Sequence, residues 1–168
     1  MGAGDNDIHG FRIDQASPSG FTTEPAHLMT VAPHRLPVSV RLSDTAFRWL
    51  DADFEQVIRH LLALGEAWAG PESVSVTREA LLGVLAFISR HLPDLTPRPS
   101  LVPTPMGGLQ LEWHDPQMDA EVEFGPLGNV IDAAVSDRRR GIEASSTSPW
   151  EVLGELQVSL KQADAGHH

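Results

Sequence analysis

The chain has no cysteine, which excludes disulfide bonds, thiolate metal sites and cysteine nucleophiles. Its apolar runs fall far short of the roughly 20 residues that a membrane-spanning helix needs. No basic patch followed by an apolar run marks a secretory signal at the N-terminus. We therefore expect a cytoplasmic protein that does not enter a membrane.

Basic residues are also scarce: 12 stand against 23 acidic ones, for a net charge of −11. Binding to nucleic acid needs a basic face, so we expect no direct contact with nucleic acid. A basic protein surface or a cation fits this charge balance better. Almost every basic residue is arginine, a usage typical of GC-rich bacterial genomes.

Two catalytic signatures are missing as well. The sequence has no Gly-x-Ser-x-Gly motif, which marks the nucleophile of many hydrolases. It has no glycine-rich phosphate loop either, because Gly107-Gly108 is a lone pair before a predicted strand and fits a tight turn. We predict that the chain is not an enzyme and uses no cofactor.

The remaining composition, 41% hydrophobic and 21% charged over 168 residues, is that of one small globular domain. Residues 1–37 mix Gly, Pro and Ser with single apolar residues, which predicts an irregular or disordered arm. Residues 38–163 form the predicted domain. Residues 164–168 are a tail whose terminal histidines resemble the start of a purification tag.

Helical spacing is clear in three places. Apolar residues three and four apart from Phe47 to Trp68 predict a first helix, which Gly65, or Gly70 followed by Pro71, ends. Thr77 is a good N-cap for a second helix, which Pro93 ends, and the short connection allows an antiparallel pair. A capping box at Ser148-Pro149-Trp150-Glu151 predicts a closing helix to about residue 162.

Strand alternation is strongest over 109–113 and 120–124. One register pairs Leu109 with Phe124, Leu111 with Val122 and Trp113 with Ala120, which places every apolar side chain on one face. Short strands are also predicted over 38–42, 130–135 and 141–144. The fold class is therefore α+β: an antiparallel helix pair and a C-terminal helix packed on one face of a small antiparallel β-meander, with an irregular N-terminal arm.

The outer face of the predicted hairpin carries the candidate site. It presents Gln110, Glu112 and His114 opposite Glu123, Glu121 and Asp119, and Glu112 stands directly across from Glu121. Like charges in a cross-strand pair are unfavourable unless they are solvated or bridged by something positive. The face can thus be a solvated surface, a docking surface for a basic partner, or a divalent-cation site built on Glu112, His114 and Glu121.

Other conspicuous residues have ordinary explanations. Arg138-Arg139-Arg140, the only basic cluster, fits an exposed turn, with pairing to an acidic surface as the alternative. His60 and His91 fit surface or helix-capping roles. The four tryptophans fit core packing, although Trp49 or Trp150 could anchor an interface.

One resemblance stands beside this interpretation. Trp68-Ala69-Gly70, the run from Val76 to Leu81, the run from Pro99 to Trp113 and Glu121-Val122-Glu123-Phe124 together resemble a family of small uncharacterised bacterial proteins. Those proteins share Trp-Asp-Gly, then Pro-Thr-x-x-Gly-Gly-x-Gln-Leu-Glu-Trp and a hairpin. The resemblance covers about residues 55–135 and implies a bacterial origin and this architecture. Ala69 replaces the family's usual Asp, so any role of that carboxylate is absent here.

Two functions follow as expectations. The first is a non-enzymatic interaction or accessory protein that docks on a larger, basic bacterial protein, for instance as an inhibitor or antitoxin. Its expected contact residues are Gln110, Glu112, His114, Glu121 and Glu123, with help from the N-terminal arm. The second is a metal-assisted hydrolase using Glu112, His114 and Glu121. A homo-oligomer stays open as a further possibility.

Overall fold

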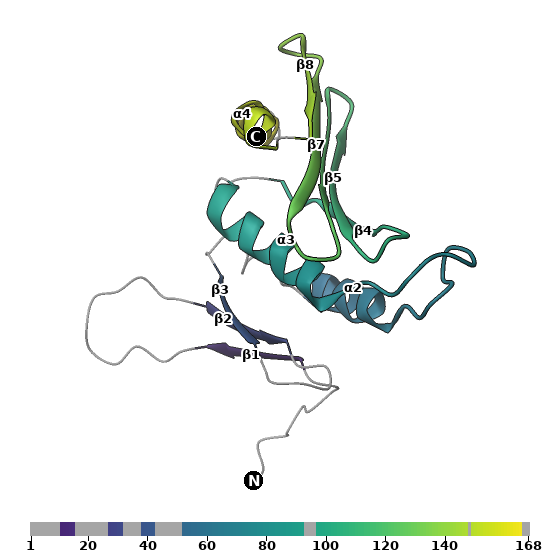
Figure 1. Ribbon diagram of the computed structural model, residues 1–168. Coiled ribbons are helices and arrows are strands. Elements are labelled where there is room, and N and C mark those ends of the chain that lie inside the picture. The colour runs from purple at the N-terminus through teal and green to yellow at the C-terminus, as the bar shows by residue number, and fades with distance from the viewer. Residues whose placement is uncertain are drawn as a thin grey trace.

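The computed structural model describes residues 52–92, 97–147 and 149–165, together with the backbone of residues 11–15, 27–31 and 38–42. Its centre is a five-stranded antiparallel sheet in the order β4-β5-β6-β7-β8. Every strand pairs with the next one along the chain, so the predicted meander is confirmed (Figure 1). The strands are β4 (Ser100–Pro103), β5 (Leu109–Asp115), β6 (Met118–Phe124), β7 (Val130–Asp137) and β8 (Ile142–Ser146).

The central hairpin has the predicted register. Leu109 pairs with Phe124, Leu111 with Val122 and Trp113 with Ala120. The pairing continues to Asp115 and Met118, so the turn is shorter than the predicted four-residue loop. Asp115 closes it, because its Oδ1 accepts the backbone N–H groups of Gln117 at 2.6 Å and Met118 at 2.9 Å.

Three helices are described: α2 (Ala52–Ala63), α3 (Arg78–His91) and α4 (Pro149–Ala165). The predicted cap of α3 is confirmed, since Thr77 Oγ1 accepts the N–H of Ala80 at 3.1 Å. The first helix ends at Ala63, just before Gly65, the earlier of its two predicted ends, although the apolar stripe continues to Trp68. Trp68 lies in the turn that follows α2, where its Nε1 donates to the carbonyl of Val74 at 3.1 Å.

Some predictions fall outside the described residues. These are the start of the first helix with Trp49, the capping Ser148, and the terminal residues 166–168.

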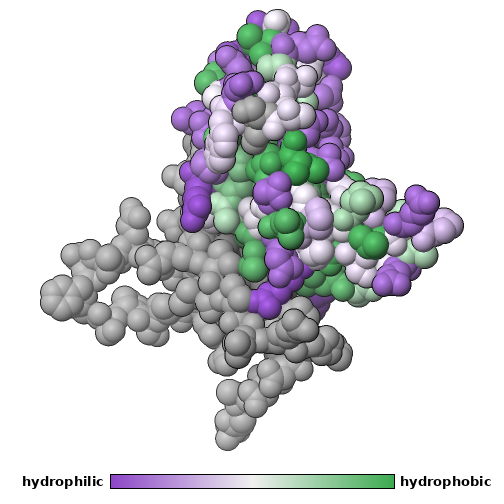
Figure 2. Space-filling model, viewed as in Figure 1, coloured by the Kyte–Doolittle hydropathy of each residue, from purple (hydrophilic) through white to green (hydrophobic). Residues whose placement is uncertain are grey.

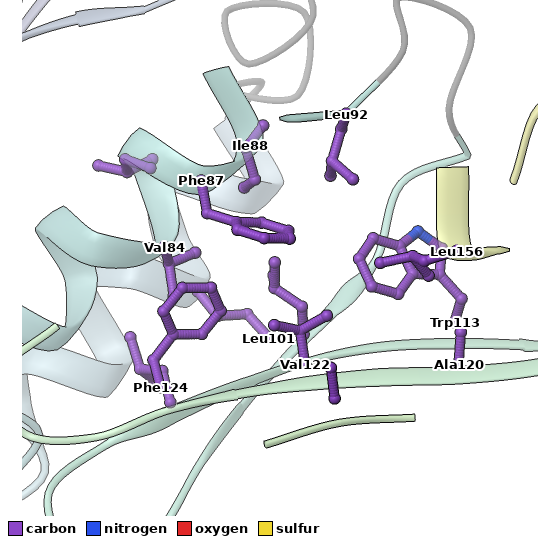
Figure 3. Packing of buried hydrophobic residues seen from close by; sticks show 14 of the residues in the cluster. Val84, Phe87, Ile88, Leu92, Leu101, Trp113, Ala120, Val122, Phe124 and Leu156 are labelled. Atoms are coloured by element: carbon purple, nitrogen blue, oxygen red, sulfur yellow. The ribbon is translucent and has the colours of Figure 1, made fainter. Parts of the chain in front are cut away.

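The helices cover one face of the five-stranded sheet. Figure 1 shows α3 and α4 on the same side of it, and their apolar stripes meet the inward side chains of β5, β6 and β7 in one buried cluster. In Figure 3, Phe87 of α3 points toward Phe124, and the two rings meet edge to face with centroids 5.4 Å apart. Leu156 of α4 lies over Trp113, so both helices share one core.

The Gly107-Gly108 pair is explained by close packing. Thr104 and Gly108 close a tight loop, with Gly108 N–H donating to Thr104 Oγ1 at 3.1 Å. A Cβ on Gly108 would lie 2.1 Å from the carbonyl oxygen of Phe124, and Gly107 has a φ of +80°. The β6–β7 turn also packs closely against α3, because a Cβ on Gly83 would lie 2.1 Å from the carbonyl oxygen of Gly128.

Two strands lie within the arm that we expected to be irregular. β1 (Phe11–Gln15) pairs with β2 (His27–Val31), which pairs with the predicted strand β3 (Val38–Leu42) in a second antiparallel sheet. Five-residue strands among Gly, Pro and Ser are too short for their alternation to stand out. α3 contacts β3, so this helix lies between the two sheets (Figure 1).

Candidate docking face

The side of the five-stranded sheet away from α3 and α4 is polar, and no described helix lies on it (Figure 1). We call this side the open face. It arises because residues alternate across each strand, so the positions between the buried apolar residues all point the same way. In Figure 2 the right-hand margin of the upper half, where this face lies, is mostly hydrophilic. Its polar and charged members include Gln110, Glu112, His114, Asp119, Glu121, Glu123, Asp132, Ser136 and Glu143.

On the open face, next to the β5–β6 turn, His114 contacts one carboxylate on each strand of the hairpin. Its Nε2 lies 3.0 Å from Glu112 Oε2, and its Nδ1 lies 3.2 Å from Asp119 Oδ1. The hydrogen bond to Glu112, and then that to Asp119, raise the pKa of His114 above its ordinary value. Arg138 extends the chain of charges, because its guanidinium donates to Asp119 Oδ2 at 3.2 Å.

The predicted Glu112–Glu121 pair is present in the register, and each carboxylate has its own neighbour. Glu121 Oε2 accepts a hydrogen bond from Gln110 Nε2 at 2.7 Å, while Glu112 is held by His114. A second like-charged pair stands beside it, since Glu123 lies opposite Asp132 on β7. Among the described residues no arginine or lysine forms an ion pair with Glu121, Glu123, Asp132 or Glu143. This part of the face therefore keeps a negative charge that the described protein does not neutralise.

The three arginines of the β7–β8 turn are committed to acidic residues of the same chain. Arg138 pairs with Asp119, Arg139 Nε with Asp137 at 3.3 Å, and Arg140 with Glu155 at 2.8 Å. Arg140 also donates to the hydroxyl of Ser159 on α4 at 3.2 Å. The basic cluster thus fastens the turn to the sheet and to α4.

Asp137 is the buried member of this network. Burial by itself raises the pKa of its carboxyl group, but the Ser159 hydroxyl and the hydrogen bonds and charge of Arg139 outweigh burial and lower that pKa. Its side chain is wholly buried, whereas that of Arg139 is partly exposed. Asp137 is therefore a structural anchor rather than part of the open face.

A pocket of about 300 Å³ opens where β4 stops short of the end of β5. We call it the notch pocket. Trp113, Met118 and Ala163 supply its apolar lining, while Glu112, His114 and Asp115 lie along its polar side together with Arg98. The Trp113 indole is fixed, because its Nε1 donates to the carbonyl of Pro97 at 2.8 Å. Glu112 and His114 line the pocket and also lie on the open face, so the pocket borders that face.

The residues predicted for a cation site are engaged with protein neighbours. Glu112 contacts His114, and Glu121 contacts Gln110. Within the described part of the chain, no group of three or more His, Asp and Glu side chains is arranged to hold a metal ion. No described helix is both long and apolar enough to cross a membrane.

The remaining aromatic candidates divide between core and surface. Trp113 is buried, as predicted, whereas Trp150 is exposed and packs its ring edge-on against His91, with centroids 5.2 Å apart. Burial, with the nearby charge of Arg90, lowers the pKa of His91. His60 is exposed on α2. These two histidines lie away from the open face.

Comparison with known proteins adds no relative: no family model, curated protein or solved structure matches this chain. The resemblance at residues 55–135 stays a prediction.

Sequence reasoning placed Gln110, Glu112, His114, Glu121 and Glu123 on one face of the hairpin, as the register confirms, but did not place Asp132 and Glu143 there. Both occupy the open face through β7 and β8, whose register was not assigned. Ala134 lies between Ala133 and Val135, so no polar alternation marks β7, and the register shift between Glu123 and Phe124 hides the pairing of Asp132.

Proposed function

We propose that this protein is a non-enzymatic interaction module that binds a basic surface of a larger protein through its open face. The observation that carries the proposal is a sheet with one face buried under helices and an acidic opposite face on which no described helix lies. Expected contacts are Gln110, Glu112, His114, Glu121 and Glu123, joined by Asp132 and Glu143. A bacterial target held by an inhibitor or antitoxin is the form of partnership that best suits so small an acidic chain.

Charge distribution supports this proposal better than net charge alone does. The arginines of the β7–β8 turn are paired within the chain, so they do not compete for the carboxylates of Glu121, Glu123 and Glu143. Complementary potential speeds association and selects among partners. The same electrostatics predict an association that weakens as salt is added.

The sheet also offers a rigid platform. Its strands are fixed by the shared core and by the close glycine contacts at the 104–108 loop and at the β6–β7 turn. A preorganised surface loses little conformational entropy on binding, which favours affinity.

Affinity purification of the full chain from its own host, followed by mass spectrometry, tests the proposal. We expect one stoichiometric partner with a basic surface, recovered at low salt and released as salt rises. Recovery of the chain alone, or of a partner whose retention does not depend on salt concentration, would contradict the proposal.

A further inference from the structure

The notch pocket borders the open face and combines an apolar lining with carboxylates. We propose that it receives a single arginine side chain of the basic partner. This inference rests on the proposed function and adds to it the residue type that anchors the complex. Anchors of this kind, an arginine in a desolvated pocket, carry much of the binding energy in protein interfaces.

Size and lining fit one long side chain. The volume, about 300 Å³, lies at the small end of ligand sites. Trp113, Met118 and Ala163 form the largely buried apolar floor along which the methylene stem would lie. The Trp113 indole is tied to Pro97 by a hydrogen bond, so this side of the pocket is already in place before a partner arrives.

Two carboxylates supply the charge. Both hydrogen bonds that Asp115 receives in its turn end on Oδ1, so Oδ2 is left for a donor from outside the turn. Glu112 contacts His114 through Oε2 only. Two separate carboxylate oxygens suit the several donors of a guanidinium group better than a single ammonium group.

The end of α4 adds a third negative contribution. Ala163 lies in the last turn of this helix, and that turn carries no basic side chain. The C-terminal end of a helix dipole is negative, which favours a cation close to it. Arg98, the cation of the pocket wall, has its guanidinium carbon 5.1 Å from the centroid of the Phe54 ring on α2.

The test uses the ¹⁵N-labelled full chain and N-acetyl-arginine-amide as the probe, with the neutral isostere N-acetyl-citrulline-amide beside it. We expect the arginine probe to shift the Trp113 indole signal and the amides of residues 112–118 saturably, and the citrulline probe to leave them unchanged. Binding should be about tenfold weaker in Glu112→Gln/Asp115→Asn, the loss expected for hydrogen bonds to a charged group. The Asn keeps the Oδ1 acceptor that closes the turn.

A variant matched in charge serves as control. Glu66→Gln/Glu72→Gln changes two exposed carboxylates in the α2–α3 connection and should bind the arginine probe as the wild type does. Equal shifts with citrulline, or unchanged affinity in Glu112→Gln/Asp115→Asn, would overturn the pocket proposal. The open face is judged separately, by partner recovery in variants of Glu121 and Glu123, so either claim can fail alone.

Discussion

Glu112 and Glu121 lie directly opposite each other on β5 and β6, and each carboxylate is held by a different neighbour. His114 contacts Glu112, and the Gln110 amide donates to Glu121. Only the first of these neighbours can carry a positive charge. The repulsion between the two carboxylates is therefore relieved on one side and persists on the other, toward Glu123 and Asp132. Because the negative charge that is not neutralised lies on that side, we place the partner's basic surface over β6 and β7.

The charge state of His114 should make stability depend on pH. Its folded pKa is raised, so the stabilising contribution is fully present below the unfolded pKa of about 6.5. It is lost as pH rises through the folded pKa. We expect wild type to exceed His114→Gln in stability at about pH 6 and to lose that advantage as the pH rises through the raised folded pKa.

Urea denaturation of both proteins across that range, with the His114 ring signals followed by NMR, measures this effect. The side chain is 62% exposed, so the difference should be small. An advantage that grows with rising pH would contradict the assigned hydrogen bonds.

Glycine-to-alanine substitutions should have opposite effects on the unfolding free energy in the tight loop and on the surface of α4. Gly108→Ala places a Cβ 2.1 Å from the Phe124 carbonyl oxygen, and we expect a loss of about 3 kcal/mol or more of unfolding free energy. Gly154→Ala meets nothing within 4 Å on α4 and should stabilise the protein by up to about 1 kcal/mol. Chemical denaturation of the two variants checks both signs. Equal effects would show that the loop packing is misplaced.

Adjacent arginines should differ in their contribution to stability. Arg139→Gln leaves the buried Asp137 without its ion pair, and we expect a loss of about 2–3 kcal/mol. Arg138→Gln removes a more exposed pair with Asp119 and should cost less than about 1 kcal/mol.

Acid unfolding provides a second measurement of the same pair. The lowered pKa of Asp137 means that its contribution holds above the unfolded pKa and is lost as pH falls through the folded one. Arg139→Gln should thus unfold at a higher pH than wild type. A midpoint that does not move would contradict the buried ion pair.

The hydrolase hypothesis makes a prediction of its own. Because Glu112 and Glu121 are engaged with His114 and Gln110, we expect millimolar Mn²⁺ or Zn²⁺ to leave the thermal midpoint unchanged within about 1 °C. A rise of several degrees that disappears in Glu112→Gln would instead favour a cation site on the open face.

The hairpin was predictable because its period-two pattern admits one register that buries every apolar residue. Thr77 marked the start of α3 for an equally local reason, a side-chain acceptor at the first turn. The sequence left two possible ends for α2, Gly65 and Gly70, because Leu64 and Trp68 continue the apolar spacing, and the helix ends at Ala63, beside the first of them. β1 and β2 escaped notice because their pairing is set by partners 12 to 20 residues away.

The sequence predicted only the hairpin part of the site, because long-range pairing leaves no local pattern. Gln110, Glu112, His114, Glu121 and Glu123 share one hairpin, so local alternation places them together. Asp132 joins them across a register shift at Glu123 and Phe124, which no local pattern reveals. The notch pocket depends on β4, β5 and α4 meeting in space, and nothing in the linear spacing announces it.

The most direct test compares the affinity of the purified partner for three forms of the full chain: wild type, Glu121→Gln/Glu123→Gln and Glu66→Gln/Glu72→Gln. The two variants change net charge equally, so they differ only in where the charge is removed. We expect the open-face variant to bind at least about tenfold more weakly and the control to bind like wild type. Equal affinity of the open-face variant and wild type, or equal losses in both variants, would contradict docking through the open face.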